Sequence, residues 1–492
     1  MFIRKRKIKI LVLFALGIAV ISFAVRSVVQ SQLNKEIVYF KRYFEEKKDV
    51  IDLFNPLAIK QIPEEVIDQL YKTALQDSSK KNPKNQIDWS KYAYVTYATH
   101  ANYICNSLII FDALKSYGTK AKLVLLVSQD LVEPEKYDDF EIVNSLLRRL
   151  TEVGGDQVII KFMKINKKSS DDTQWSYSLN KLEVFNQTEF DRVIYMDNDA
   201  ILHDNLDELF FLPDYIKFAA PLAYWDLKEH DITASYNEVR NYEKLPINLE
   251  RYNDKIIPRI KKHKMIYNHL PSLPPNLFLD TQNVAQDIIR SEFSFSSMFD
   301  HHITKQPNKI NFASNLMVIK PSQETFKLLR DYLIPAYLKK EEGYDMDLIN
   351  NDLYNMKKLI RKQFNYFRRI RTHFVPEVLV LPFGRYDVLT GSIKNRHEQS
   401  MLKNDVIGYR RVNSEGEELP KSVDEVIQDA KYIHFSDFPL QKPWEYESFE
   451  EIECHADELK DNTIEEPEKT CTAWNSAYLT YMYSRNICWI GE

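Results

Sequence analysis

The segment from Leu179 to Leu212 reads LNKLEVFNQTEFDRVIYMDNDAILHDNLDELFFL. Its apolar run RVIYM, residues 192–196, predicts a buried strand, and the tripeptide Asp197-Asn198-Asp199 follows directly. Most such acidic tripeptides are solvated turns, but this one stands between two apolar runs, where carboxylates need a partner. Two carboxylates two residues apart can reach one hard cation, and oxygen ligands suit Mg²⁺ or Mn²⁺. The segment therefore predicts a divalent-metal site at the end of a strand.

Strands and helices alternate along the chain on the way to this site. We expect strands at 92–97, 121–128 and 157–165, and helices at 103–117, 141–153 and 178–186. This alternation predicts an α/β fold with a Rossmann-like mixed, mainly parallel sheet and helices on both faces. Ligands bind at the carboxyl ends of strands in such sheets, and a metal there could bridge the oxygens of a diphosphate.

The composition excludes several classes of protein. Of the 492 residues, 44% are hydrophobic and 28% are charged, which indicates a globular rather than a disordered chain. A net charge of -5 without a basic stripe gives no reason to expect a nucleic-acid partner. The chain has 10 glycines and no cluster of them that could cradle phosphates. If the protein binds phosphates, a metal and side chains must therefore make most of the contacts.

The N-terminus carries a basic cluster from Arg4 to Lys9, followed by the uncharged apolar run Ile10–Val25. With its flanking residues this run approaches the length of a membrane span, about 20 residues. A cleaved signal peptide is the alternative, but bulky Phe23 and Val25 disturb the small-residue pattern that cleavage needs. We therefore predict a cytosolic tail at residues 1–9, a signal-anchor transmembrane helix at 10–29 and a lumenal stem at 30–90.

Four cysteines are present, Cys105, Cys454, Cys471 and Cys488, and none belongs to a Cys-x-x-Cys pair, which argues against a zinc site. In an oxidising lumen two of them could pair and tie down the C-terminal tail, whereas in the cytosol they would remain thiols. The spacing does not decide which would pair. The glycosylation tripeptide Asn186-Gln187-Thr188 agrees weakly with a lumenal location.

Further segments recur in the order of a known family. The Leu179–Leu212 segment resembles the core of the glycogenin-like glycosyltransferases, which have the GT-A nucleotide-diphospho-sugar transferase fold. Four other segments resemble this family in the same order: YVTYATHANY at 94–103, FASNLMVIKP at 312–321, DMDLIN at 345–350 and KYIHFSDFPLQKPW at 431–444. The ordered set is more specific than any one of its members. The resemblance implies a GT-A catalytic domain, which we place at residues 91–450.

A closer resemblance covers nearly the whole chain. The anchor, DNDAIL at 197–202, YNHLPSLP at 267–274 and the closing motif at 434–444 together are similar to the fungal Golgi glucose N-acetyltransferases, a family of N-acetylglucosaminyltransferases that act on N-glycan outer chains. This resemblance implies a Golgi single-pass membrane protein. It also implies UDP-N-acetylglucosamine (UDP-GlcNAc) as the donor, a terminal mannose as the acceptor and Mn²⁺ (or Mg²⁺) as the cofactor.

The family motifs assign roles to the metal and phosphate residues. Asp197 and Asp199 should bind the metal, with His434 as the third protein ligand, and neutral imidazole is a suitable ligand for Mn²⁺. Lys442 should contact the diphosphate as a point charge. Its spacing from His434 is two residues longer than in glycogenins, and the usual glycine between them is missing, which leaves its reach open.

The same motifs place residues around the nucleoside and the donor sugar. Tyr97, Thr99 and Tyr103 match the nucleoside-binding loop, and Tyr103 could stack on uracil. Lys181 matches a lysine near the donor sugar that could also pair with an aspartate of the tripeptide. The last matches are Ser314, which would lie beside the donor sugar, and Asp345, which would hydrogen-bond that sugar or act as the nucleophile if the retaining reaction uses one.

The remaining segments and the alternatives complete the prediction. We assign the insertion at 226–310 to acceptor binding, because loops on a rigid scaffold tend to carry specificity, and the tail at 451–492 to packing on the domain. Another donor, such as UDP-glucose, UDP-galactose or GDP-mannose, remains open. So does a membrane-tethered binding protein that holds Ca²⁺, whereas acids two residues apart suit a glycoside hydrolase poorly. The sequence does not give the oligomeric state.

Overall fold

The computed structural model describes residues 16–25, 27, 59–79, 86–135, 139–168, 174–243, 249–277, 309–359, 377–403, 406–409, 417, 421–459, 464 and 466–489. No helix within these residues is long and apolar enough to cross a membrane. The predicted span at 10–29 is described only at 16–25 and 27, so it receives no support from the structure and stays a prediction. The account below concerns the unit formed by residues 56–281 and 307–492.

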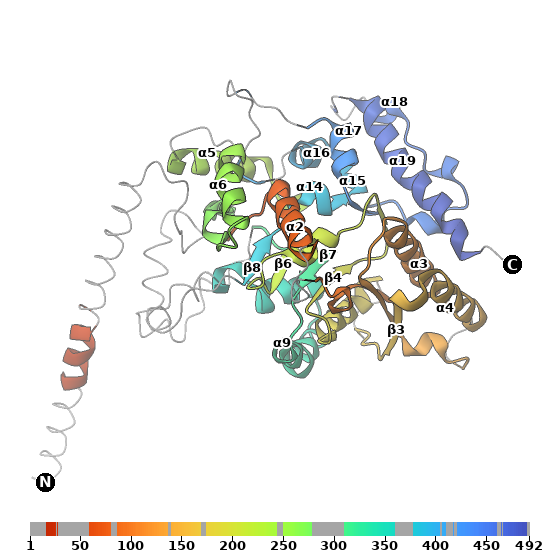
Figure 1. Cartoon of the computed structure of the whole chain (residues 1–492), viewed down its shortest axis with the longest axis horizontal. Helices are drawn as coiled ribbons and strands as arrows, with labels where there is room; N and C mark the ends of the chain where they lie inside the picture. The colour runs from red at the N-terminus through yellow and green to blue at the C-terminus, as the bar shows by residue number, and fades with distance from the viewer. Residues whose placement is uncertain are drawn as a thin grey trace, which may run out of the picture. The chain divides into compact units, whose positions relative to one another are not determined.

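A seven-stranded sheet forms the centre of this unit, with the order β3-β2-β1-β4-β7-β6-β8 (Figure 1). The pairs β3–β2, β2–β1, β1–β4 and β6–β8 are parallel, whereas β7 runs antiparallel to both β4 and β6. The predicted mixed, mainly parallel sheet is therefore confirmed. Its strands are β1 (Tyr92–Ala98), β2 (Lys122–Ser128), β3 (Val158–Met163), β4 (Arg192–Met196), β6 (Phe218–Ala220), β7 (Leu316–Ile319) and β8 (Val378–Val380).

Helical segments cover both faces of the sheet. Neighbouring residues of a strand point to opposite faces. On one face, Thr96 of β1 hydrogen-bonds Ser107 of helix α3 (Ala101–Ser116), and helix α4 (Phe140–Gly154) packs beside α3. On the other face, the Tyr97 ring lies against the Tyr195 ring of β4, which the Lys181 ammonium of η5 (Gln174–Asn186) approaches. Segment η5 is a 3₁₀ helix, where we expected an ordinary helix at 178–186.

A second, three-stranded sheet has the order β5-β10-β9 and contains the strands β5 (Ala200–Leu202), β9 (Val388–Leu389) and β10 (Tyr432–His434). Strand β5 begins directly after the acidic tripeptide and runs antiparallel to β10, so that His434 lies opposite Ala200. Strand β10 also runs parallel to β9. This small sheet therefore brings the C-terminal part of the chain to the end of β4.

The other described α-helices are short, apart from α2, α5, α6 and α19. Helix α2 packs against the 3₁₀ turn η6 (Asp207–Phe211), and Gln61 forms a bridge to Val380, so the chain around residues 60–79 packs on the sheet. The bounds are α2 (Glu64–Ser79), α5 (Glu229–Glu243), α6 (Leu249–Ile260), α9 (Gln323–Leu328), α10 (Ile334–Tyr337), α11 (Asp345–Leu348), α14 (Phe383–Tyr386), α15 (Thr390–Ile393), α16 (Arg396–Leu402), α17 (Val423–Asp429), α18 (Ala456–Leu459) and α19 (Pro467–Arg485).

Helix α19 packs against α3, α15, α17 and α18 near the C-terminal end of the chain (Figure 1). Two disulfides secure this region. Cys105 of α3 is joined to Cys488, and Cys454 is joined to Cys471 of α19. All four cysteines are therefore paired, and the structure supplies the connectivity that the spacing left open. The first of these bonds links the end of the chain to the helix that follows β1.

Candidate metal centre

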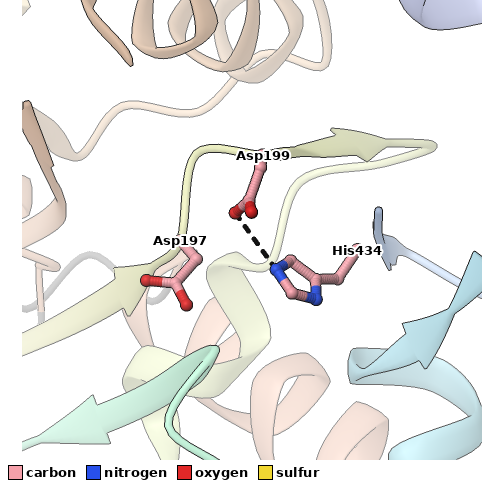
Figure 2. A group of neighbouring side chains, drawn as sticks. All are labelled: Asp197, Asp199 and His434. Carbon is pink, nitrogen blue, oxygen red and sulfur yellow. Dashed lines mark hydrogen bonds and ion pairs between the residues drawn. The ribbon is translucent and has the colours of Figure 1, made fainter. Parts of the chain in front are cut away.

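Asp197, Asp199 and His434 lie together at the carboxyl end of β4. Each offers one ligand atom, and these atoms all lie within 4.8 Å of one another. Figure 2 shows the two carboxylates on the turn that follows β4, with the His434 imidazole directed at Asp199. The His434 Nε2 lies 3.1 Å from Asp199 Oδ1. The structure therefore brings together all three residues that the motifs assigned to the metal.

Backbone and amide hydrogen bonds fix the turn that carries the two aspartates. The Asp197 amide donates to the Asn315 carbonyl at 2.7 Å. Between the aspartates, the buried Asn198 side chain donates to the carbonyls of Tyr97 (2.9 Å) and Tyr103 (2.8 Å). The middle residue of the tripeptide thus ties the turn of residues 197–199, called the metal turn below, to the segment after β1. The sequence did not predict this role of Asn198, because a polar residue between two acids does not by itself indicate its hydrogen-bond partners.

The side chain of Asp199 is held from the C-terminal part of the chain. Lys442 Nζ lies 2.7 Å from Asp199 Oδ2, while His434 contacts the other oxygen. The Phe435 amide also donates to the Asp199 carbonyl at 2.9 Å. Burial alone would raise the pKa of Asp199, but Lys442 and His434 hold this pKa well below its usual range. Lys442 therefore reaches the metal turn despite its longer spacing from His434.

Asp197 is held instead by residues from the large sheet. Lys181 Nζ lies 3.1 Å from Asp197 Oδ2 and 3.0 Å from Asp345 Oδ2, and the Tyr195 hydroxyl donates to Asp197 Oδ1. Burial raises the pKa of Asp197, against the attraction of Lys181. The two aspartates raise the pKa of Lys181 although burial opposes this, so the lysine remains charged. Ser314 Oγ lies 3.5 Å from the same ammonium.

Asp345 and its neighbour Asp347 have different surroundings. Asp345 is the first residue of α11, and its side chain is buried against Lys181. Asp347 accepts a hydrogen bond from the Tyr344 amide at 2.9 Å and thus caps α11. Of the two carboxylates, Asp345 is the one that shares a lysine with the metal turn.

The donor atoms of this site fit a divalent cation. Two carboxylates and one imidazole form a mixed oxygen and nitrogen set, which suits Mn²⁺ better than Mg²⁺, because Mg²⁺ favours oxygen ligands and water. The other ring nitrogen, Nδ1 of His434, is buried and has no hydrogen-bond partner among the described residues. Lys181 pairs with Asp197 and Lys442 pairs with Asp199, so the charges of the aspartates are compensated in the protein itself.

The residues predicted for the nucleoside lie at and after the end of β1. Tyr103 is close enough to both aspartates of the turn that they raise its pKa, with burial as the largest cause. Its ring packs edge-on against Trp444, with 5.6 Å between the ring centroids. Thr99 is buried, and its hydroxyl lies 3.0 Å from His100 Nδ1. Tyr97 packs on Tyr195 and so lies beside Asp197.

Two buried carboxylates near the site were not predicted from the sequence. Asp387 accepts a hydrogen bond from Asn315 at 2.9 Å, and burial raises its pKa to about 7, against the attraction of His434. Asp437 lies three residues after His434 and accepts hydrogen bonds from Trp474 and Tyr478 of α19. No short motif marks either residue, since each acquires its surroundings from distant segments.

Comparison with proteins of known sequence identifies close relatives. The chain is 50% identical to glucose N-acetyltransferase 1 of Saccharomyces cerevisiae over 490 residues, which covers 99% of both chains. It is 45% identical to glucose N-acetyltransferase 1 of Candida glabrata over 488 residues, with 99% of this chain and 97% of the relative covered. No model of a protein family matches the chain.

Solved structures are more distant. The galactosyltransferase LgtC, solved with donor and acceptor sugar analogues, is 11% identical, and the match covers 78% of this chain and 96% of that chain with a TM-score of 0.35. The fungal relatives, by contrast, match this chain over nearly its full length. This protein belongs to the glucose N-acetyltransferase family.

Proposed function

We propose that this protein is a metal-dependent N-acetylglucosaminyltransferase that transfers GlcNAc from UDP-GlcNAc to a terminal mannose of N-glycan outer chains. One observation carries the proposal. Asp197, Asp199 and His434 meet at the carboxyl end of a parallel strand, between two lysines that compensate their charge. Ligands bind at that edge of such sheets, and the family relationship makes the protein a transferase. The proposed fold type is GT-A, with the aspartate turn as its metal-binding motif.

In this proposal Asp197, Asp199 and His434 hold Mn²⁺. When bound, the cation neutralises charge on the diphosphate and helps the nucleotide to leave. Lys442 has its ammonium 2.7 Å from Asp199 and can add a second positive charge at the same place. The lysine is fixed before the substrate arrives, so it needs little reorganisation during the reaction. The positive charge of Lys442 thus stabilises the leaving nucleotide diphosphate.

The donor sugar would lie on the side of Lys181, Ser314 and Asp345. Lys181 holds Asp345 and Asp197 together, so the carboxylate of Asp345 faces the same region as the metal turn. A carboxylate that a lysine already neutralises is a weak nucleophile, because its charge is partly compensated. This favours a role for Asp345 in holding a hydroxyl of the donor sugar. A retaining front-face displacement needs no protein nucleophile.

A Golgi location with a signal anchor at 10–29 is part of the same proposal. The basic cluster before the apolar run favours a cytosolic N-terminus, by the positive-inside rule. The two disulfides favour a lumenal catalytic domain, because disulfides persist in oxidising compartments. Protease treatment of isolated Golgi vesicles that contain the full-length protein, with and without permeabilisation, tests this orientation. Protease digestion of the catalytic domain in intact vesicles would contradict it.

Transfer activity tests the chemical proposal. The full-length protein in detergent would be incubated with Mn²⁺, a mannose oligosaccharide and, in turn, UDP-GlcNAc, UDP-glucose, UDP-galactose or GDP-mannose, and release of the nucleotide diphosphate would be measured. We expect Mn²⁺-dependent turnover with UDP-GlcNAc that is lost on chelation. Turnover with a different donor would keep the site and overturn the donor assignment. Metal binding without turnover of any donor would overturn the proposed reaction.

A further inference from the structure

A loop of five residues, 437–441, connects two groups that both bond to Asp199. His434, three residues before the loop, contacts Asp199 Oδ1 at 3.1 Å, and Lys442, directly after it, contacts Oδ2 at 2.7 Å. The loop therefore leaves the metal centre and returns to it. Phe438, in the middle of this stretch, is four residues from His434 and four residues from Lys442.

Hydrogen bonds at both ends hold this loop in place. The Asp437 side chain is buried, with 3% of its area exposed, and accepts hydrogen bonds from Trp474 Nε1 and Tyr478 OH, each at 2.9 Å. The Leu440 amide donates to the Asp437 carbonyl at 2.6 Å. At the other end, the Gln441 amide donates to the Tyr446 hydroxyl at 3.0 Å. The loop is thus a fixed element of the fold.

Two apolar side chains on this fixed loop face solvent. Phe438 is 97% exposed, the highest value among the large hydrophobic side chains that the structure describes, and Leu440 is 40% exposed. A single exposed apolar residue is common on protein surfaces. Here, however, the aromatic ring is almost entirely exposed, and it stands on a loop that lies in the chain between two residues that contact Asp199. A rigid aromatic group can bind a partner at low cost in conformational entropy.

We propose that Phe438 is the stacking platform for a pyranose ring of the carbohydrate acceptor. The C–H face of a pyranose lies flat on an aromatic ring, while its hydroxyls remain free to form hydrogen bonds at the ring edge. The inference rests on the proposed function, since it takes the acceptor to be a glycan. Phe438 suits the acceptor because its ring is open to solvent while its loop lies between two residues that contact Asp199. Phe438 is then a specificity-determining residue outside the metal and nucleotide machinery.

The test compares Phe438→Ala with Phe438→Trp in the full-length protein. Loss of the ring removes the surface on which the pyranose stacks. The acceptor KM for a mannose oligosaccharide should therefore rise about tenfold. The KM for UDP-GlcNAc, and UDP release to water without acceptor, should stay within about twofold. Phe438→Trp should retain tight acceptor binding. Tyr332→Ala, which removes another exposed aromatic ring (68% exposed) on a different segment, is the matched control and should change nothing.

Calorimetric titration of the mannose oligosaccharide into protein loaded with Mn²⁺ and UDP gives a readout that does not need turnover. Weaker binding by Phe438→Ala, with wild-type binding by Phe438→Trp, supports the platform. An unchanged acceptor affinity in Phe438→Ala overturns it, whatever the activity. A wild-type protein that binds the glycan through Phe438 without transferring any sugar would instead overturn the proposed reaction and keep the platform. A wild-type protein that does not bind the glycan overturns both.

Discussion

The two aspartates of the metal turn lie two residues apart, yet different parts of the molecule control them. Asp197 is held from the large sheet by Lys181, whose side chain is only 7% exposed and also pairs with Asp345. Asp199 is held from the C-terminal part of the chain by His434 and by Lys442, whose side chain is 23% exposed. Burial raises the pKa of Asp197, whereas Lys442 and His434 lower the pKa of Asp199.

This difference separates stability from activity. The side of Lys181 is a buried charge cluster that the fold needs, since an unpaired buried carboxylate is costly. Lys442 is more exposed than Lys181, 23% against 7%, whereas Asp199 and Asp197 are similarly buried at 13% and 17%, so the Lys442 ammonium is the more accessible of the two to a bound diphosphate. We therefore expect substitutions on the first side to damage the fold and those on the second side to damage the reaction.

The largest effect should come from Asp199→Ala. It removes a proposed metal ligand and the shared partner of His434 and Lys442, so metal-dependent UDP release should fall by at least about 10³-fold, equivalent to about 4 kcal/mol. Steady-state assays at saturating donor measure this loss. Asp204→Asn, which removes another acidic side chain in the same segment, is the control, because Asp204 is half exposed and pairs with Lys431 instead. Near-normal turnover by Asp199→Ala would contradict a metal role for this turn.

The next effect sharpens the comparison of the two lysines. Lys181→Met should lower the free energy of unfolding by about 3–5 kcal/mol, because it leaves Asp197 and Asp345 buried without their cation. Lys442→Met should lower this free energy by less than Lys181→Met does, because His434 still contacts Asp199, but it should lower UDP release by about 10²-fold. Thermal or urea unfolding measures the first quantity and donor turnover the second.

Lys161→Met serves as the surface control for this pair, because Lys161 and its partner Glu189 are both substantially exposed. It should cost less than about 1 kcal/mol. Equal destabilisation by Lys181→Met and Lys442→Met would show that the two sides of the metal turn do not differ as the burial suggests.

The large sheet and the aspartate turn that follows β4 were more predictable from the sequence than the C-terminal part of the site. Periodicity located β1, β2, β4 and the helices between them, and the apolar run before Asp197 placed the acidic turn at a carboxyl end. The strand predicted at 157–165 is shorter, Val158–Met163, and the helix predicted at 178–186 is a 3₁₀ helix. Such differences arise because boundaries and helix type depend on packing that local patterns do not contain.

The C-terminal side was predicted only through family motifs. Nothing local to His434 says that it meets Asp199, since the contact depends on the pairing of β10 with β5. The roles of Asp387, Asp437 and Trp474 were missed for the same reason, because their partners lie on distant segments. The disulfide between Cys105 and Cys488, which spans 383 residues, is likewise a product of the tertiary fold. Long-range polar pairing therefore marks the limit of sequence reasoning here.

A smaller effect should appear in the pH dependence of stability through Asp387. Burial raises its pKa to about 7 in the folded protein, compared with about 3.9 in an unfolded chain. Between these two pKa values the folded state holds a proton that the unfolded state has lost. The contribution of Asp387 to the free energy of unfolding therefore declines as pH rises towards 7 and is constant above it. Between pH 5 and pH 8 wild type should lose about 3 kcal/mol relative to Asp387→Asn. Thermal unfolding with the metal chelated measures this loss, and parallel pH profiles of the two proteins would rule it out.

The smallest effect tests how helix α19 supports the side of Lys442. Trp474→Phe removes one hydrogen bond to Asp437 and keeps an aromatic ring in place, so it should loosen the segment that carries His434. The Mn²⁺ concentration for half-maximal UDP release should rise by up to about tenfold, the low end for outer-shell partners of metal ligands. Thr470→Val removes a buried hydrogen bond of α19 to Gln399, away from the metal centre, and should destabilise similarly without changing the Mn²⁺ requirement. If both variants shift that requirement equally, α19 acts only through overall stability; if only Trp474→Phe shifts it, the helix positions the metal ligand.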